Sequence, residues 1–173
     1  MLVIILIAVS LSMDAFSLSL AYGTLNLDKK YILKLSLIVG IYHFFMPLIG
    51  MFLGSKFLEF LPNPSLIVFI ILSFIGIQMI VETFKEEKKM ELKSILQLLT
   101  FGLAVSIDSF SVGIGLKTIS NNFLLCAATF SLSSFIFTYL GLILGKKINQ
   151  LIGKISTLLG GIVLIIIGIF YLI

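Results

Sequence analysis

The sequence reads SLSMDAF at residues 10–16 and AVSIDSF at residues 104–110, and each stretch lies inside a long apolar run. Each stretch places an aspartate, Asp14 or Asp108, where the surrounding residues avoid charge. A charged side chain at the centre of a membrane costs at least ~2.5 kcal/mol unless it is neutralised or solvated. The repetition of so costly a residue in near-identical surroundings indicates that the aspartates have a function.

The composition of the chain is that of a membrane protein. Of its 173 residues, 60% are hydrophobic and 12% are charged, about half the usual charged share of ~25%. A water-soluble protein of this size could not bury that much apolar surface, so we expect lipid as the solvent. The basic residues are all lysines scattered over short loops, so we expect no nucleic acid partner. The N-terminal run lacks a basic start and carries Asp14, which predicts a retained helix and not a cleaved signal peptide.

Six apolar runs are long enough to cross a membrane, for which a helix needs about 20 residues. They cover Leu2–Tyr22, Leu33–Gly54, Ser65–Thr83, Ser94–Leu116, Phe123–Gly145 and Leu151–Ile173. Turn and charge signals separate them, and alternation with a period of two, as in a membrane barrel, is absent. The sequence therefore predicts an all-α integral membrane protein with one domain over residues 1–173.

The two halves of the chain, 1–84 and 94–173, resemble each other and are joined by a charged loop at 85–93. Alignment of the two aspartates pairs Ser12 with Ser106, Phe16 with Phe110 and Ser17 with Ser111. Each half holds three spans, so the second half starts on the opposite side of the membrane. We therefore predict six transmembrane helices arranged as a 3+3 inverted repeat, which is typical of secondary transporters with ion sites near the midplane.

Two glycine pairs occupy matching places in the second span of each half. They are Gly50 with Gly54, and Gly141 with Gly145. Glycines four residues apart let helices approach closely, which predicts packing between the halves. The same motifs could serve a homodimer, although nothing in the sequence indicates one.

The lysines predict how the chain is oriented. Ten lie in or beside the loops after the first, third and fifth spans: Lys29, Lys30, Lys34, Lys85, Lys88, Lys89, Lys93, Lys146, Lys147 and Lys154. Two, Lys56 and Lys117, lie after the second and fourth spans. Because positive charge collects on the cytoplasmic side, we expect a multi-pass protein of the cell membrane with both termini outside.

The surroundings of the two aspartates favour a divalent cation. Residues three and four apart share a helix face, so Asp14 lies with Ser10 and Ser17, and Asp108 with Ser111. Carboxylate and hydroxyl oxygens suit hard cations such as Mg²⁺, Ca²⁺ and Mn²⁺. No lysine lies deep in a predicted span, so emptied carboxylates would tend to take up protons. The alternatives are a protonated aspartate bonded to a neighbouring helix and serines bonded to their own backbone.

Other polar residues in the spans are weaker candidates. His43 could bind metal or relay protons, or it could form an interhelical hydrogen bond. Gln78 could receive an ion on entry, whereas Glu82 near the end of the same span is expected to reach interfacial water. Behind Asp108, the glycines of Gly113-Ile114-Gly115 could loosen the helix and free carbonyl oxygens.

SMDAFSLSLAYG, SIDSFSVGIG and HFFMPLIGMFLG resemble the MntP-type manganese efflux pump family over essentially the whole chain. The resemblance implies export of Mn²⁺ through a fold similar to that of LysE-type exporters, with Asp14 and Asp108 as site residues. It implies a transporter with Mn²⁺ as cargo, without a cofactor and not an enzyme, and exchange with protons is our expectation from the chemistry of the site. An intramembrane diaspartyl protease lacks support, because the Gly-x-Gly-Asp signature is absent. A non-transporting membrane protein, like a similar sporulation-associated group, remains the other alternative.

Overall fold

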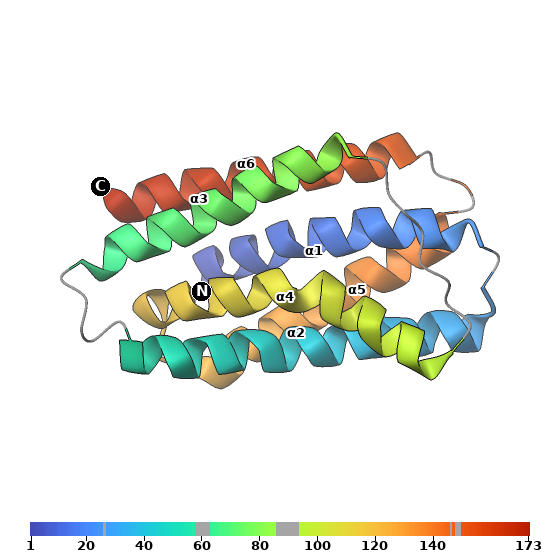
Figure 1. Ribbon diagram of the computed structural model, residues 1–173, viewed down its shortest axis with the longest axis horizontal. Helices are drawn as coiled ribbons and strands as arrows, with labels where there is room; N and C mark the ends of the chain where they lie inside the picture. Colours follow the sequence, from blue (N-terminus) through green and yellow to red (C-terminus); the bar gives the residue numbers. More distant parts are fainter. Residues whose placement is uncertain (26, 58–62, 86–93, 146, 148–149) are drawn as a thin grey trace.

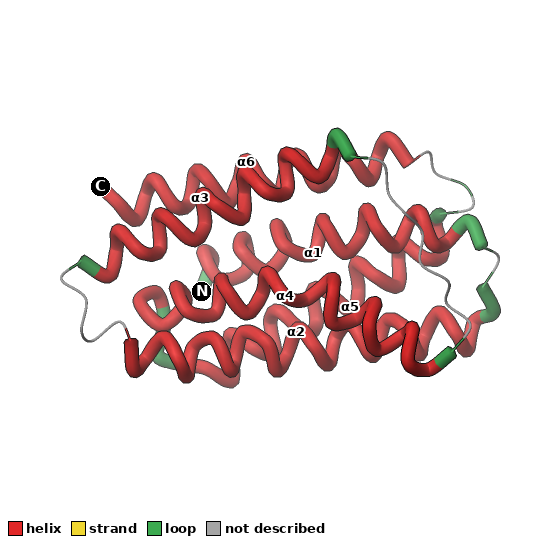
Figure 2. The backbone as a smooth tube through the Cα atoms, in the orientation of Figure 1, coloured by secondary structure: helices red, strands yellow, loops and turns green. Residues whose placement is uncertain are grey.

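A computed structural model of the chain describes residues 1–25, 27–57, 63–85, 94–145, 147 and 150–173. In that part of the chain it consists of helices joined by short connections (Figures 1 and 2). The helices are α1 (Leu2–Gly23), α2 (Lys29–Phe57), α3 (Pro64–Thr83), α4 (Ile95–Ile119), α5 (Phe123–Leu144) and α6 (Gln150–Leu172). Each is long and apolar enough to cross a membrane, so the predicted all-α membrane protein with six spans is confirmed. Most of the predicted loop at 85–93 lies outside the described residues.

The helices begin where the sequence provides a cap. The side chains of Asn63 and Asn122 accept hydrogen bonds from backbone amides at the starts of α3 and α5. Ser94 and Gln97 form a reciprocal capping box at the start of α4. α2 starts at Lys29, four residues before the predicted span, because lysines near a helix end can extend their charge to the interface.

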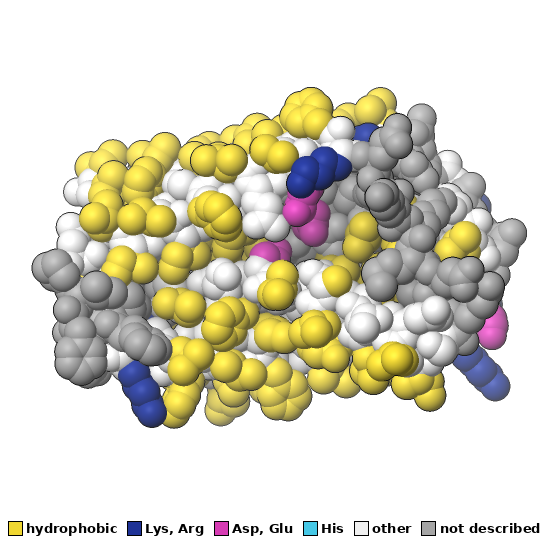
Figure 3. All heavy atoms as spheres, in the orientation of Figure 1, with side chains coloured by type: hydrophobic (Ala, Val, Ile, Leu, Met, Phe, Trp, Pro, Cys, Tyr) yellow, Lys and Arg dark blue, Asp and Glu magenta, His cyan; other side chains and the backbone are white. Residues whose placement is uncertain are grey.

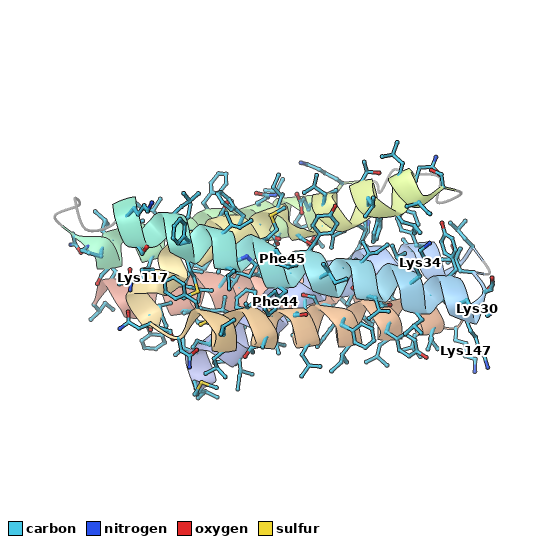
Figure 4. All side chains as sticks on the ribbon, turned by 90° about the horizontal axis from the view of Figure 1, so that it is seen from below. Lys30, Lys34, Phe44, Phe45, Lys117 and Lys147 are labelled. Atoms are coloured by element: carbon cyan, nitrogen blue, oxygen red, sulfur yellow. The ribbon has the colours of Figure 1, made fainter. Side chains whose placement is uncertain are left out.

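The helices form a bundle in which α3 and α6 lie side by side along one edge (Figure 1). α1 packs on α5 and α6, while α2 packs on α4 and α5. Both termini lie at one end of the bundle, and the connections after α1, α3 and α5 lie at the other (Figure 1). Lys30, Lys34 and Lys147 mark that second end, whereas Lys117 lies at the end with the termini (Figure 4). We call the second end the lysine-rich end.

The apolar core differs between the two ends. Toward the termini, all six helices contribute to one buried cluster, with members such as Ile7, Met51 and Phe130. At the lysine-rich end, a second cluster that includes Tyr22, Leu35 and Phe101 draws on α1, α2, α4 and α5. Among the described residues, none of those in this second cluster belongs to α3 or α6. The bundle is therefore closed around its axis at one end and less completely packed at the other.

The predicted glycine packing between the halves is confirmed. A Cβ atom on Gly54 of α2 would lie 2.5 Å from the carbonyl oxygen of Ile114 in α4, and one on Gly141 of α5 would lie 2.7 Å from that of Phe16 in α1. Side chains larger than hydrogen would push these helices apart. These glycines are thus occupied by contacts within the chain and are not left exposed for a second copy.

One local prediction was wrong. α4 continues as a regular helix through residues 113–115 up to Ile119, so the glycines there do not loosen it. Gly113 packs against the backbone of Pro47, with the proline carbonyl oxygen 2.5 Å from where its Cβ would be. Gly113 therefore allows α4 to pack closely on α2 along this segment.

Candidate functional site

A cavity of about 260 Å³ lies in the less completely packed half of the bundle. Its lining comes from four helices and the residues after α3: Asp14, Ser17, Leu18, Glu82, Thr83, Lys85, Ala104, Val105, Lys154 and Thr157. At ~30 Å³ for each water molecule, this volume has room for an ion with several waters. Acidic and basic side chains gather at a hollow on the face drawn in Figure 3. We call this cavity the Asp14 pocket.

α1 presents Asp14 and Ser17 to the Asp14 pocket, as their spacing of three residues predicts. The neighbouring α6 supplies Thr157, whose hydroxyl donates to the backbone carbonyl of Gly153 at 3.3 Å and also lies 3.5 Å from that of Met13. The pocket therefore combines a carboxylate with two hydroxyl oxygens on adjacent helices. Such oxygens are suitable ligands for a hard divalent cation.

Asp108 lies one helical turn away from the Asp14 pocket. Ala104 and Val105, four and three residues before it, line the pocket on the same side of α4. Asp108 itself is half-buried and is not among the described lining residues. Its carboxylate accepts a hydrogen bond from the backbone amide of Ser109 at 2.7 Å. The expectation that Asp14 and Asp108 hold one ion together stays a prediction.

Glu82 is the second carboxylate of the Asp14 pocket, and sequence reasoning set it aside as an interfacial residue. Gln78, the stronger sequence candidate, is exposed and donates a hydrogen bond to Glu82 at 3.0 Å. The spacing of four residues between Gln78 and Glu82 was the available signal, because it puts both on one face of α3.

His43 is fully buried between α2 and α4. Its Nδ1 lies 2.8 Å from the hydroxyl of Ser106 and 3.0 Å from the carbonyl oxygen of Val39. This is the interhelical hydrogen bond that sequence reasoning gave as the alternative to metal binding. His43, Ser10 and Ser111 are not among the described residues that line the Asp14 pocket. Their roles as metal ligands stay predictions.

The sequence has no lysine deep in a predicted span, yet two lysines line the pocket that Asp14 also lines. Lys154 lies in α6, inside a helix long enough to span the membrane, and it lines the Asp14 pocket together with Lys85. It was counted with the loop lysines because it lies near the start of its span. A basic residue inside an apolar run was the signal that could have singled it out.

Comparison with known proteins gives consistent matches. A family model described as "Putative manganese efflux pump" matches residues 26–172. A protein of Bacillus pumilus, named "Putative manganese efflux pump MntP", is 37% identical over 95% of this chain and 90% of its own length. Proteins of the same name from Geobacillus thermodenitrificans and Methanobrevibacter smithii are 37% and 38% identical, over 97% and 96% of this chain and 93% of each relative.

These relatives are named as pumps and not as enzymes, and their names mention manganese as what is moved. No solved structure matches the chain. A family model that covers most of the chain, and relatives aligned over nearly their whole length, establish the assignment. The chain belongs to the family described as "Putative manganese efflux pump".

Proposed function

We propose that this protein exports Mn²⁺ from the cytoplasm as a secondary transporter. The observation that carries the proposal is the Asp14 pocket, where a carboxylate from the middle of a membrane span meets Glu82 and the hydroxyls of Ser17 and Thr157. Two carboxylates can neutralise one divalent cation, and oxygen ligands suit Mn²⁺. The choice of Mn²⁺ over other divalent cations comes from the names of the relatives.

The position of the pocket supports entry of the ion from the cytoplasm. It lies toward the lysine-rich end, where Lys85 of the pocket follows the end of α3. By the positive-inside rule that end faces the cytoplasm, so both termini lie outside. At the opposite end, the apolar cluster to which all six helices contribute would separate the pocket from the exterior. This arrangement fits a carrier in its inward-facing form.

An inverted repeat is supported by matching contacts in the two halves. The Ser12 hydroxyl lies 3.0 Å from that of Ser134 and donates to the carbonyl of residue 8. The Ser106 hydroxyl lies 2.8 Å from Nδ1 of His43 and donates to the carbonyl of residue 102. Ser12 and Ser106 are the residues that alignment of the two aspartates pairs. The α1–α5 and α4–α2 contacts are thus alike, as exchange of the halves by a two-fold axis requires.

Asp108 completes the proposed transport path. Because it lies one turn beyond Ala104, away from the lysine-rich end, an ion bound at Asp14 would meet it near the midplane. When the metal leaves, carboxylates in a dry environment repel one another, and protons relieve that repulsion. We therefore propose that Mn²⁺ is exchanged for protons, so the apparent affinity for Mn²⁺ falls as the pH falls.

Transport by purified protein in liposomes tests the proposal. Asp14→Asn keeps the shape of the side chain and removes its charge, so Mn²⁺ flux should fall at least about a hundredfold while the melting temperature stays close to that of the unaltered protein. Asp28→Asn, at an exposed position beside α2, is the matched control and should transport normally. A pH dye trapped in the liposomes should report proton movement opposite to Mn²⁺.

Undiminished flux in Asp14→Asn would contradict the role of this carboxylate. Mn²⁺ flux without any proton movement, together with an affinity that does not change between mildly acidic and neutral pH, would contradict exchange for protons. The two outcomes are independent, because an ion can bind at Asp14 and still be coupled to a different counter-ion.

A further inference from the structure

The Asp14 pocket contains positive as well as negative charges. Asp14 and Glu82 contribute carboxylates, while Lys85 and Lys154 contribute ammonium groups, and all four side chains line one cavity of about 260 Å³. A pocket that only had to attract a cation would need no lysine, because a nearby positive charge opposes binding. The presence of ammonium groups in a cation pocket therefore needs an explanation.

Close packing of α6 on α1 brings Lys154 into the cavity that Asp14 lines. A Cβ atom on Gly153 would lie 2.9 Å from the hydroxyl oxygen and 3.0 Å from the Cα of Ser17. One turn further along α6, Thr157 lies 3.5 Å from the carbonyl oxygen of Met13. These contacts lie on either side of Asp14 along α1, and Lys154 shares the face of Thr157. These contacts hold the segment of α6 that carries Lys154 against the segment of α1 that carries Asp14, and both residues line the Asp14 pocket.

Lys85 is placed less firmly. It follows the residue that caps α3 and is exposed, whereas Lys154 is half-buried within a helix. A flexible four-carbon stem with a compact charge can approach a carboxylate or withdraw toward water. Lys85 can thus withdraw into water easily. Lys154, which is half-buried in the helix wall of the pocket, is the lysine whose stem can bring the charge to the acids and move it away when another cation binds them.

We propose that the ammonium group of Lys154 is a tethered counter-cation, which offsets one of the two carboxylate charges of Asp14 and Glu82 when the pocket holds no metal and competes with a divalent cation for them. The inference rests on the proposed function and deepens it. Competition weakens metal binding on the cytoplasmic side and favours release of the metal. It also offsets one of the two carboxylate charges of the empty pocket, and the proposed protons offset the rest.

Binding of Mn²⁺ to the purified protein, followed by the electron paramagnetic resonance of the free ion, tests this inference. Lys154→Met should bind Mn²⁺ at least about fivefold more tightly, the effect of one unit charge at ~4 Å even in bulk water. In liposomes its KM should fall and its maximal rate should fall as well, since release becomes slower. Lys154→Arg, which keeps the charge, should retain the affinity of the unaltered protein within about twofold.

Lys147→Met is the matched control, because Lys147 lies exposed at the same end of the bundle (Figure 4) and is not among the described residues that line the pocket. Its affinity should not change. Lys154→Gln provides a second neutral variant if Lys154→Met does not fold. Unchanged or weaker binding in the neutral variants, with normal transport by the unaltered protein, would overturn the role of Lys154 and leave the proposed function intact. An unaltered protein that neither binds nor carries Mn²⁺ would overturn the proposed function and this inference with it.

Discussion

The seam between α1 and α6 and the seam between α4 and α3 are built differently, although the helices they join hold matching places in the two halves. α6 packs closely along α1, whereas α3 packs more loosely on α4. At the α1–α6 seam, Gly153 lies against Ser17 and Gly160 lies 2.5 Å, measured from its ideal Cβ position, from the carbonyl oxygen of Ser10. The Asp14 pocket is bordered by α3 and α4 at the looser seam.

The residues at the two seams explain the difference. Gly76 of α3 and Gly161 of α6 lie against each other's carbonyl oxygens, at 2.5 and 2.6 Å from the ideal Cβ positions. Aligning these two glycines, a shift of 85 residues, pairs Gly153 with residue 68 and Gly160 with residue 75. Those residues are Val68 and Ile75, both buried. Branched side chains keep α3 at a distance from α4 that glycines do not require for α6 on α1.

The comparison teaches that differences in side-chain size at a few helix contacts accompany close packing at one seam and a cavity at the other. We call the α1–α6 contact the tight seam and the α3–α4 contact the loose seam. At the tight seam Lys154 lines the same cavity as Asp14, and at the loose seam Glu82 lines that cavity as well. The following experiments either disrupt the tight seam or test the role of the loose seam.

Substitution of the tight seam should have the largest effect. Gly160→Leu places a side chain where the Ser10 carbonyl oxygen lies, so we expect overpacking that costs at least about 1–3 kcal/mol and loss of most folded protein. Gly168→Ala on the same helix is the control, because its Cβ would meet atoms at 3.3–3.4 Å that can move slightly. Thermal unfolding in detergent measures both. Equal melting temperatures for the two variants would contradict the tight seam.

Locking the loose seam should stop transport without unfolding the protein. In a Cys126→Ala background, Thr83→Cys and Ala104→Cys place thiols on α3 and α4 across the Asp14 pocket. A short bifunctional thiol reagent should abolish Mn²⁺ flux, because the seam has to change shape as the pocket empties and refills. Ser73→Cys with Gly168→Cys is the control. The Ser73 hydroxyl lies 3.3 Å from the ideal Cβ of Gly168, so this pair would cross-link α3 to α6 and not α3 to α4. Equal flux before and after cross-linking at the pocket would show that this seam does not move.

Neutralising the carboxylate of the loose seam should have a moderate effect. Glu82→Gln removes one of the two negative charges of the Asp14 pocket, so KM for Mn²⁺ should rise at least about fivefold. Gln78→Ala removes the neighbouring hydrogen bond of 3.0 Å without changing any charge, and it should alter KM less than about twofold. Flux measured in liposomes at a series of Mn²⁺ concentrations gives the KM of both variants. A larger change of KM in Gln78→Ala than in Glu82→Gln would contradict the role of Glu82 as the second carboxylate of the Asp14 pocket.

The smallest effects are expected at the α1–α5 and α4–α2 contacts, which resemble each other. Ser12→Ala and Ser106→Ala each remove an interhelical hydrogen bond, between α1 and α5 or between α4 and α2, and each should cost about 0.6–1.7 kcal/mol of unfolding free energy. Ser156→Ala is the control, because that hydroxyl bonds back to Ile152 of its own helix. Unfolding in denaturing detergent measures the three variants. A cost at Ser12 or Ser106 no larger than that at Ser156 would argue against these bonds as clamps.

Much of the architecture could be predicted from the sequence. Hydropathy and length alone identify all six spans, because lipid demands apolar residues over the whole width of the membrane, whichever helices meet. The glycine pairs were expected to join the halves, since close helix approach needs small residues wherever it occurs. Ser17 was placed beside Asp14 correctly, because residues three apart on a helix share a face.

Only the tertiary structure decided which groups surround Asp14. Glu82 and Lys154 come from α3 and α6, far from Asp14 in sequence, and nothing in an apolar run states which of its sides will face another helix. Packing across the bundle decides that, through contacts such as Gly153 on Ser17 and Gly76 on Gly161. The same packing turned His43 toward Ser106 and left the Asp14 pocket at the lysine-rich end. The sequence alone determined that charged residues lie inside membrane-spanning segments. The fold determined which of these residues share one cavity, because the lining of a cavity depends on which helices pack side by side.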